Sequence, residues 1–116
     1  MTTQTTDPVI GRLRAQSDNR NAFEAMQNYM ALPAPTFVAR HDVVYVSVAD
    51  ADDLLPWLSE LGGEIHRSAE FEGVQLWTLH TFTPPTGDGS RIPIRVSVPL
   101  PMGESVMPEL LEAVAR

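Results

Sequence analysis

The sequence predicts a small α+β protein, in which a helical arm precedes the order β, α, β, β, β, α and an antiparallel sheet carries its helices on one face. Residues 44–48 and 92–98 alternate apolar with other side chains, as strands with one buried face do. Between them, residues 54–61 repeat Leu and Trp at the spacing of one helix face. The chain of 116 residues is long enough to bury a core. We expect a single domain over residues 7–116.

The N-terminal part predicts a polar tail and then a helical arm over residues 7–31. Residues 1–6 offer nothing to bury and are expected to be disordered. Asp7 before Pro8 is typical of a helix start. The cap-forming residues 17–21, SDNRN, interrupt the apolar pattern and predict a break or kink. The prolines of residues 32–35 then end the arm.

The central part predicts one strand over residues 36–48, rich in β-branched and aromatic residues, followed by a helix. With Asp53 as the N-cap, Pro56 takes the third helical position, where no N–H is needed. Gly62 or Gly63 supplies the left-handed C-cap. The sheet and this helix together span residues 36–98.

Three more strands and a helix complete the prediction. The strands cover residues 64–69, 74–83 and 92–98, and Pro93 marks the last as an edge strand or as the start of a strand. The sequence FEGV indicates a hairpin, and residues 105–115 a C-terminal helix. If the hairpin loop has an even length, the core face of residues 74–82 is Val74, Leu76, Thr78, His80 and Phe82.

Composition narrows the classes of function. With 15 acidic residues, 8 arginines and no lysine, the net charge of −7 disfavours nucleic acid and anionic membranes as partners. The absence of cysteine excludes disulfides and thiolate sites, and no run of residues is long and apolar enough for a membrane span. We expect a cytoplasmic protein, with a codon bias of the GC-rich, actinobacterial kind.

Candidate metal and catalytic residues have simpler structural explanations. Asp50, Asp52 and Asp53 stand at a helix N-terminus, where carboxylates cap free N–H groups. The predicted register points His66 and His80 to opposite faces of the sheet, which argues against a histidine metal site. The glycines of residues 86–90, TGDGS, lack the lysine of a phosphate loop. No metal, no cofactor and no catalytic residue is predicted, and an enzyme is the less favoured class.

The predicted activity is therefore a non-enzymatic protein-interaction or regulatory one, with self-association as a homodimer. The opposite sheet face includes Trp77, which needs a cover from the arm or from a second copy. The arm carries an apolar stripe that packs within the chain or on a partner. The candidate interface residues are Phe23, Met26, Tyr29, Met30 and Trp77.

Residues 43–98 resemble one βαβββ module of the vicinal oxygen chelate superfamily, which includes glyoxalases and bleomycin-resistance proteins. The likeness lies in Val48-Ala49-Asp50 before a helix that ends in Leu61-Gly62. The metal ligands of the family would fall near Val43 and near residues 97–98, and both are missing.

The resemblance implies a metal-free module whose cleft forms between two copies, and hence a protein that binds or sequesters a small molecule. This is the alternative function. Arg91 and Arg95, near the glycine-containing loop, are suited to a carboxylate or another anion. The candidate cleft residues are Trp77, His80, Arg91 and Arg95.

Overall fold

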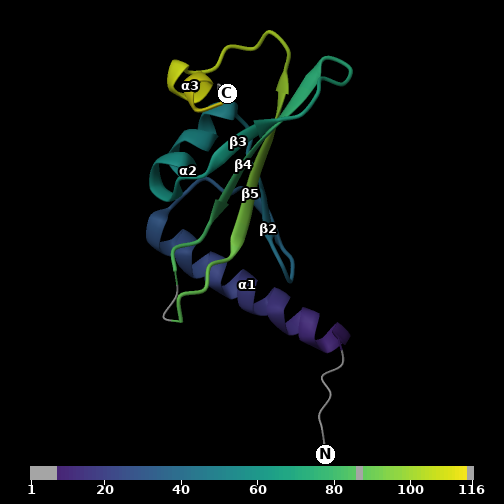
Figure 1. The fold of residues 1–116 in the computed structure, drawn as a ribbon, viewed down its shortest axis with the longest axis vertical. Coiled ribbons are helices and arrows are strands. Elements are labelled where there is room, and N and C mark those ends of the chain that lie inside the picture. The colour runs from purple at the N-terminus through teal and green to yellow at the C-terminus, as the bar shows by residue number, and fades with distance from the viewer. Residues whose placement is uncertain (1–7, 86–87, 115–116) are drawn as a thin grey trace, which may run out of the picture.

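A computed structural model of the chain confirms the α+β class and describes residues 8–85 and 88–114 (Figure 1). The predicted tail, residues 1–6, lies outside the described residues. The elements are α1 (Pro8–Met30), β1 (Thr36–Ala39), β2 (Val44–Ser47), a 3₁₀ turn (Ala51–Asp53), α2 (Leu54–Leu61), β3 (Glu64–Arg67), β4 (Val74–Phe82), β5 (Pro93–Pro101) and α3 (Pro108–Val114).

The five strands form one mixed sheet in the order β1-β2-β5-β4-β3. Every neighbouring pair is antiparallel except β2 and β5, which run parallel, so the predicted antiparallel sheet is confirmed apart from one parallel pair. Of the two predicted roles of Pro93, the start of a strand is found and the edge position is not, because Pro93 is the first residue of β5 and β5 is central. β2 pairs with residues 94–97, so the prolines at 93, 99 and 101 all lie outside the segment paired on both sides.

The predicted strand over residues 36–48 is two strands, β1 and β2, joined by a tight turn. Arg40 N–H donates to the carbonyl of Val43 at 2.8 Å, which closes that turn. The side chain of Asn19, from the middle of α1, donates to the carbonyls of Arg40 and His41 at 2.9 and 3.1 Å. Two backbone carbonyls of the turn thus receive hydrogen bonds from one side chain of α1.

Helix α1 is continuous, and the predicted break at residues 17–21 does not occur. Cap-forming residues interrupt a helix when their side chains bond to the local backbone. The side chain of Asn19 instead donates to the β1–β2 turn, so it does not compete for the backbone hydrogen bonds of the helix. The first half of α1 leaves Val9, Ile10 and Leu13 more than half exposed, whereas the second half enters the core.

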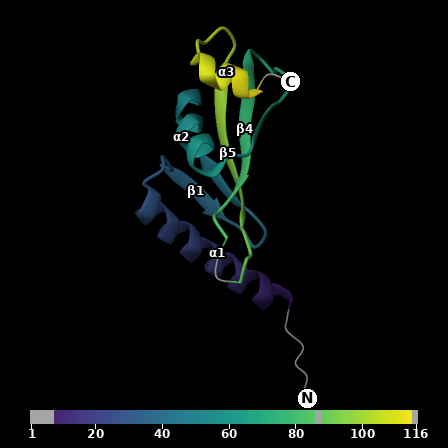
Figure 2. The ribbon, with the colours of Figure 1, turned by 60° about the vertical axis from the view of Figure 1, so that its left-hand side comes forward.

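The core lies between the sheet and the three helices, which all cover the same face (Figures 1 and 2). Phe23 of α1 stacks on Trp57 of α2 with ring centroids 6.0 Å apart, and contacts Phe37 of β1 at 4.6 Å. The indole N–H of Trp57 donates to the carbonyl of Pro33 at 2.8 Å. Phe23 and Trp57 are both fully buried. Leu110 and Val114 of α3 close the far end of the core.

The predicted face of β4 is inverted, because one extra residue shifts the hairpin register. Phe71 and Val74 bridge across a two-residue turn at Glu72 and Gly73, as the FEGV sequence indicates. Three residues separate Phe71 from the paired Arg67, but two separate Val74 from its partner Trp77. This is a β-bulge, and a slip of one residue exchanges the two faces.

As a result, Trp77, Leu79 and Thr81 face the core, and the alternate residues face outward. Ile65 lies opposite Leu79 in the core, and His66 lies opposite Thr78 on the outward side. His66 and His80 therefore share one face, contrary to the prediction.

The position of Phe23 in the core predicts a large effect of its removal. Phe23→Ala should lower the free energy of unfolding by about 3–5 kcal/mol, the usual loss for a buried phenylalanine. Tyr29→Ala, on the same helix at 88% exposure, should change it by less than about 0.5 kcal/mol. Urea unfolding of both variants measures the difference. Equal stability of the two variants would show that α1 does not belong to the core.

Candidate functional site

The outward side of the sheet is covered by none of the three helices and is called the open face here. Alternation within the strands assigns it sixteen residues. They are Thr36, Val38, Tyr45, Ser47, Glu64, His66, Val74, Leu76, Thr78, His80, Phe82, Pro93, Arg95, Ser97, Pro99 and Pro101.

Large apolar side chains are spread across the open face. Val38 of β1, Tyr45 of β2, and Val74, Leu76 and Phe82 of β4 are between 38% and 49% exposed. Single exposed apolar residues are ordinary on a protein surface, whereas a set of them on one flat face is typical of a contact surface. In β4 the alternation of side chains is visible in the sequence and predicts two faces for the strand. The bulge exchanges which of the two faces points to the core.

The charge of the open face differs from that of the whole protein. Of the 15 acidic residues in the chain, the open face carries Glu64 alone, together with Arg95 and two histidines. Charged residues are depleted in the same way at the centres of protein interfaces. The net charge of −7 therefore resides on the other surfaces and on the loops.

A polar cluster occupies the open face where β3, β4 and β5 lie side by side. Glu64 pairs across strands with His80, and His80 pairs with Arg95. The rings of His66 and His80 meet edge to face with centroids 4.6 Å apart. Nε2 of His66 lies 3.4 Å from a carboxylate oxygen of Glu64. No carboxylate of the described residues lies within ion-pair distance of Arg95.

The surroundings of His80 disfavour its protonation. Partial burial of the ring, followed by the positive charges of His66 and Arg95, lowers the pKa of His80 below its ordinary value of 6.5. The carboxylate of Glu64 opposes this shift. His80 is therefore a neutral ring at pH 7, able to donate from one nitrogen and accept at the other.

Gly63 fixes how β3 enters this cluster. Its φ of 114° suits glycine, and a Cβ added there would collide with the carbonyl oxygen of His80. Without a side chain at residue 63, β3 comes close enough to β4 for Glu64 to lie opposite His80.

The candidate interface residues lie mostly in the core of the chain. Phe23, Met26 and Trp77 are at most 8% exposed, and Met30 packs against the core. Tyr29 is 88% exposed and is not part of the core cluster. The arm thus packs within its own chain, and Trp77 lies under the helices. Its indole N–H donates to the side chain of Gln75 at 2.9 Å.

The candidate cleft residues divide between the two faces of the sheet. His80 and Arg95 are cross-strand neighbours on the open face. Arg91 lies nearby, with its guanidinium 5.1 Å from the ring centre of Phe82 and its Nε donating to the carbonyl of Thr83. Trp77 faces the core and cannot join them.

The acidic residues before α2 act in the local structure. The backbone N–H of Asp50 donates to the carboxylate of Asp53 at 3.4 Å, and the N–H of Met107 donates to that of Asp52 at 3.2 Å. Asp52 thus joins the start of α2 to the approach to α3. Residues 8–85 and 88–114 contain no group of three side chains suited to a metal ion. Within the predicted TGDGS loop, residues 86 and 87 lie outside the described residues.

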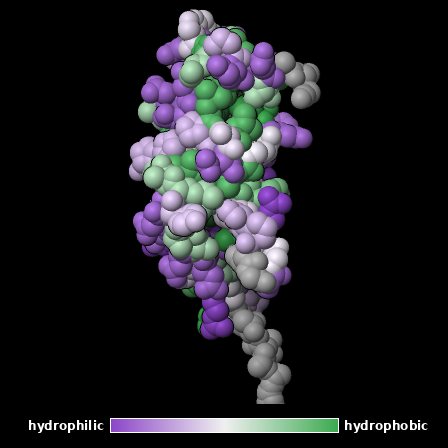
Figure 3. Space-filling view, turned by 90° about the vertical axis from the view of Figure 1, so that its left-hand side faces the viewer, coloured by the Kyte–Doolittle hydropathy of each residue, from purple (hydrophilic) through white to green (hydrophobic). Residues whose placement is uncertain are grey.

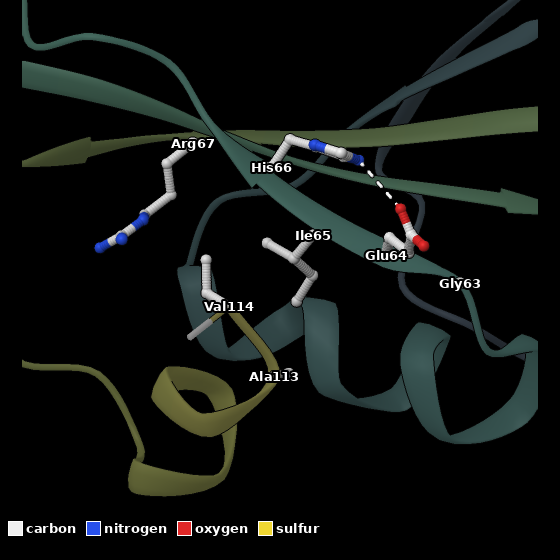
Figure 4. Close-up of a pocket in the computed structure, with 7 residues that line it drawn as sticks. All are labelled: Gly63, Glu64, Ile65, His66, Arg67, Ala113 and Val114. Atoms are coloured by element: carbon white, nitrogen blue, oxygen red, sulfur yellow. Dashed lines mark ion pairs between the residues drawn. The ribbon is translucent and has the colours of Figure 1, made fainter. Parts of the chain in front are cut away.

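The helical side is patterned differently. Hydrophilic residues lie along its margins, and hydrophobic residues show between them in the upper half (Figure 3). A hollow of about 570 Å³ lies at the β3 end of the sheet, lined by residues 63–67, Ala113 and Val114 (Figure 4). A smaller one of about 140 Å³ lies at the start of α2.

Comparison with protein-family models, with curated proteins and with solved structures finds no match to this chain. In the described part of the chain, no helix is both long and apolar enough to cross a membrane.

The polar cluster predicts how His80 titrates. Its pKa, followed by NMR, should lie below 6.5, should rise in Arg95→Gln and should fall further in Glu64→Gln. Because the unfolded chain then binds the proton more readily, His80 removes stability as the pH falls through about 6.5. Arg91→Gln is the matched control and should leave the pKa of His80 unchanged. A pKa at or above 6.5 in the unaltered protein would contradict the described cluster.

Proposed function

We propose that this protein is a non-enzymatic interaction domain that associates with itself, and that the open face is the surface of contact. The observation that carries the proposal is the set of five exposed apolar residues on a face with one acidic side chain in an acidic protein. The helices are all used on the other face. A second copy supplies the missing cover, as paired copies with two-fold symmetry commonly do.

The size of the open face suits such a contact. Strands about 4.8 Å apart, with a rise of about 3.3 Å per residue, give five strands of these lengths a face on the order of 500 Å². Rough side chains increase this area toward the approximately 800 Å² that each partner buries in a standard interface. Two flat sheets stacked about 10 Å apart form the usual sandwich core.

The charges of the open face are compatible with burial against a second copy. Two copies of a protein with a net charge of −7 repel each other in general. The open face carries one acidic residue and one arginine, so this repulsion is small there. Arg95 and Glu64 are separated by His80 on the sheet, so a second copy related by a two-fold axis is able to bring each close to the opposite charge. Neutral His80 avoids the cost of burying another cation.

A charge placed within the open face should prevent association. Leu76→Glu, at a residue 43% exposed, should weaken self-association by at least about 2 kcal/mol, or roughly 30-fold in dissociation constant. Leu13→Glu on α1, at 58% exposure, is the matched control and should have no such effect. Analytical ultracentrifugation measures both, and thermal unfolding verifies that both variants fold. Equal association of the two variants would refute the proposed surface.

The alternative is binding of a small anion with an apolar part, held on the same face between two copies. Arg95 favours it, because its guanidinium has no carboxylate partner among the described residues and stands beside Tyr45 and His80. A panel of aromatic carboxylates should then raise the melting temperature by mass action. Arg95→Gln should remove the shift, and Arg91→Gln should retain it. No shift at millimolar concentration would exclude this alternative.

A further inference from the structure

The β3 edge, residues 64–67, is the outer edge of the last strand in the sheet. β4 pairs with one side of β3, and no strand of the described residues pairs with the other. An edge of this kind offers unpaired N–H and C=O groups to another strand.

The direction of these groups follows from the pairing with β4. Ser68 N–H donates to the carbonyl of Leu76 at 2.8 Å, so the backbone groups of Ser68 point toward β4. Backbone groups alternate in direction along an antiparallel pair. The groups of Glu64 and His66 therefore also point toward β4, and those of Ile65 and Arg67 point to the open edge. No described residue bonds to the N–H of Ile65 or Arg67.

The space beside the edge admits another strand. The hollow of about 570 Å³ runs along residues 63–67 and is bounded by the end of α3. Figure 4 shows Ile65 pointing toward Val114 and His66 lying on the other side of the strand. Glu64 and His66 are 82% and 59% exposed, so both are accessible to a neighbouring chain.

We propose that the β3 edge pairs antiparallel with the same edge of a second copy, around a two-fold axis at Ile65. This inference rests on the proposed self-association and gives it a second, separate surface. The two five-stranded sheets become one continuous sheet, and the open faces of both copies lie on the same side of it.

The register of this pairing follows from the sheet face that each residue occupies and from the side chains that come to lie opposite one another. A continuous sheet requires opposed residues to share a face, so an outward residue must meet an outward residue. With Ile65 opposite Ile65, Glu64 of each copy lies opposite His66 of the other, and each carboxylate faces an imidazole that can donate a hydrogen bond to it. The alternative centred on His66 opposes two histidines and leaves Glu64 opposite a serine. The pairing of carboxylate with imidazole thus selects the register centred on Ile65.

Cysteine substitutions test this register in a chain that has no cysteine of its own. Opposed residues of a hydrogen-bonded pair have Cα atoms about 5.5 Å apart, within disulfide range. Ile65→Cys should therefore form a covalent dimer under mild oxidation. In Glu64→Cys the two cysteines are diagonal neighbours about 7–8 Å apart, beyond the usual disulfide range, and this more exposed variant should remain monomeric in denaturing gels. More dimer from Glu64→Cys than from Ile65→Cys would overturn the proposal.

A charge exchange tests the pairing without a covalent bond. In a Leu76→Glu background, which removes the open-face contact, Glu64→Lys should raise the dissociation constant of the remaining association about tenfold, because the carboxylate opposite His66 of the other copy is lost. In the same background, the double variant E64K/H66E places a lysine opposite a glutamate and should restore association to within a factor of about three. Failure of the double variant to recover, with an unchanged melting temperature, would overturn the β3 pairing.

The two contact surfaces are separated by comparing these variants with Leu76→Glu. Loss of association in Leu76→Glu, together with no cross-linking of Ile65→Cys, retains the open face and overturns the edge. Cross-linking of Ile65→Cys that persists in the presence of Leu76→Glu supports the edge as a surface separate from the open face. Equal association of Leu76→Glu and Leu13→Glu, with that cross-linking retained, refutes the open face and keeps the edge. A protein that sediments as a monomer at millimolar concentration overturns both.

Discussion

The stack of Phe23 on Trp57 is the contact on which the arrangement of the chain depends. It joins α1 to α2, and Phe37 joins the pair to the first strand. The hydrogen bond from Trp57 to Pro33 fixes the segment between α1 and β1 at the same place. Because this cluster attaches the arm to the helical side, the arm is not available to cover the other face of the sheet. The open face is a direct consequence of where these aromatic rings meet.

The bulge before the β3–β4 turn then decides which residues occupy the open face. Without the extra residue, the face now buried would carry Leu76 and His80, and Trp77 would be exposed. With it, Trp77 and Leu79 fill the core, and a histidine pair and Arg95 assemble outside. One extra residue in a surface hairpin therefore decides which side chains of β4 pack in the core and which join the polar cluster on the open face.

Period and turn chemistry predicted the α+β class, the helix with Pro56 and its glycine cap, and the hairpin at FEGV. These are local signals, and each is satisfied within a few residues. The register of β4, the β1–β2 turn and the continuity of α1 depend on contacts between distant residues, such as Asn19 with Arg40. Composition alone could not assign a face to Trp77, since a tryptophan suits a core and an interface equally. The sequence did not predict the polar cluster, because the register expected for β4 assigned His66 and His80 to opposite faces of the sheet.

The central place of β5 has a consequence for how the chain is made. Of the five strands of this sheet, β5 is synthesised last, yet it lies between β2 and β4, and its pairing joins Val44 to Ile94 across the interval that contains α2, β3 and β4. Until it arrives, two separate hairpins exist, each marginal by itself in water. Closing so long an interval costs chain entropy before its contacts form. The nascent protein must therefore hold β2 unpaired on one side until β5 has been synthesised.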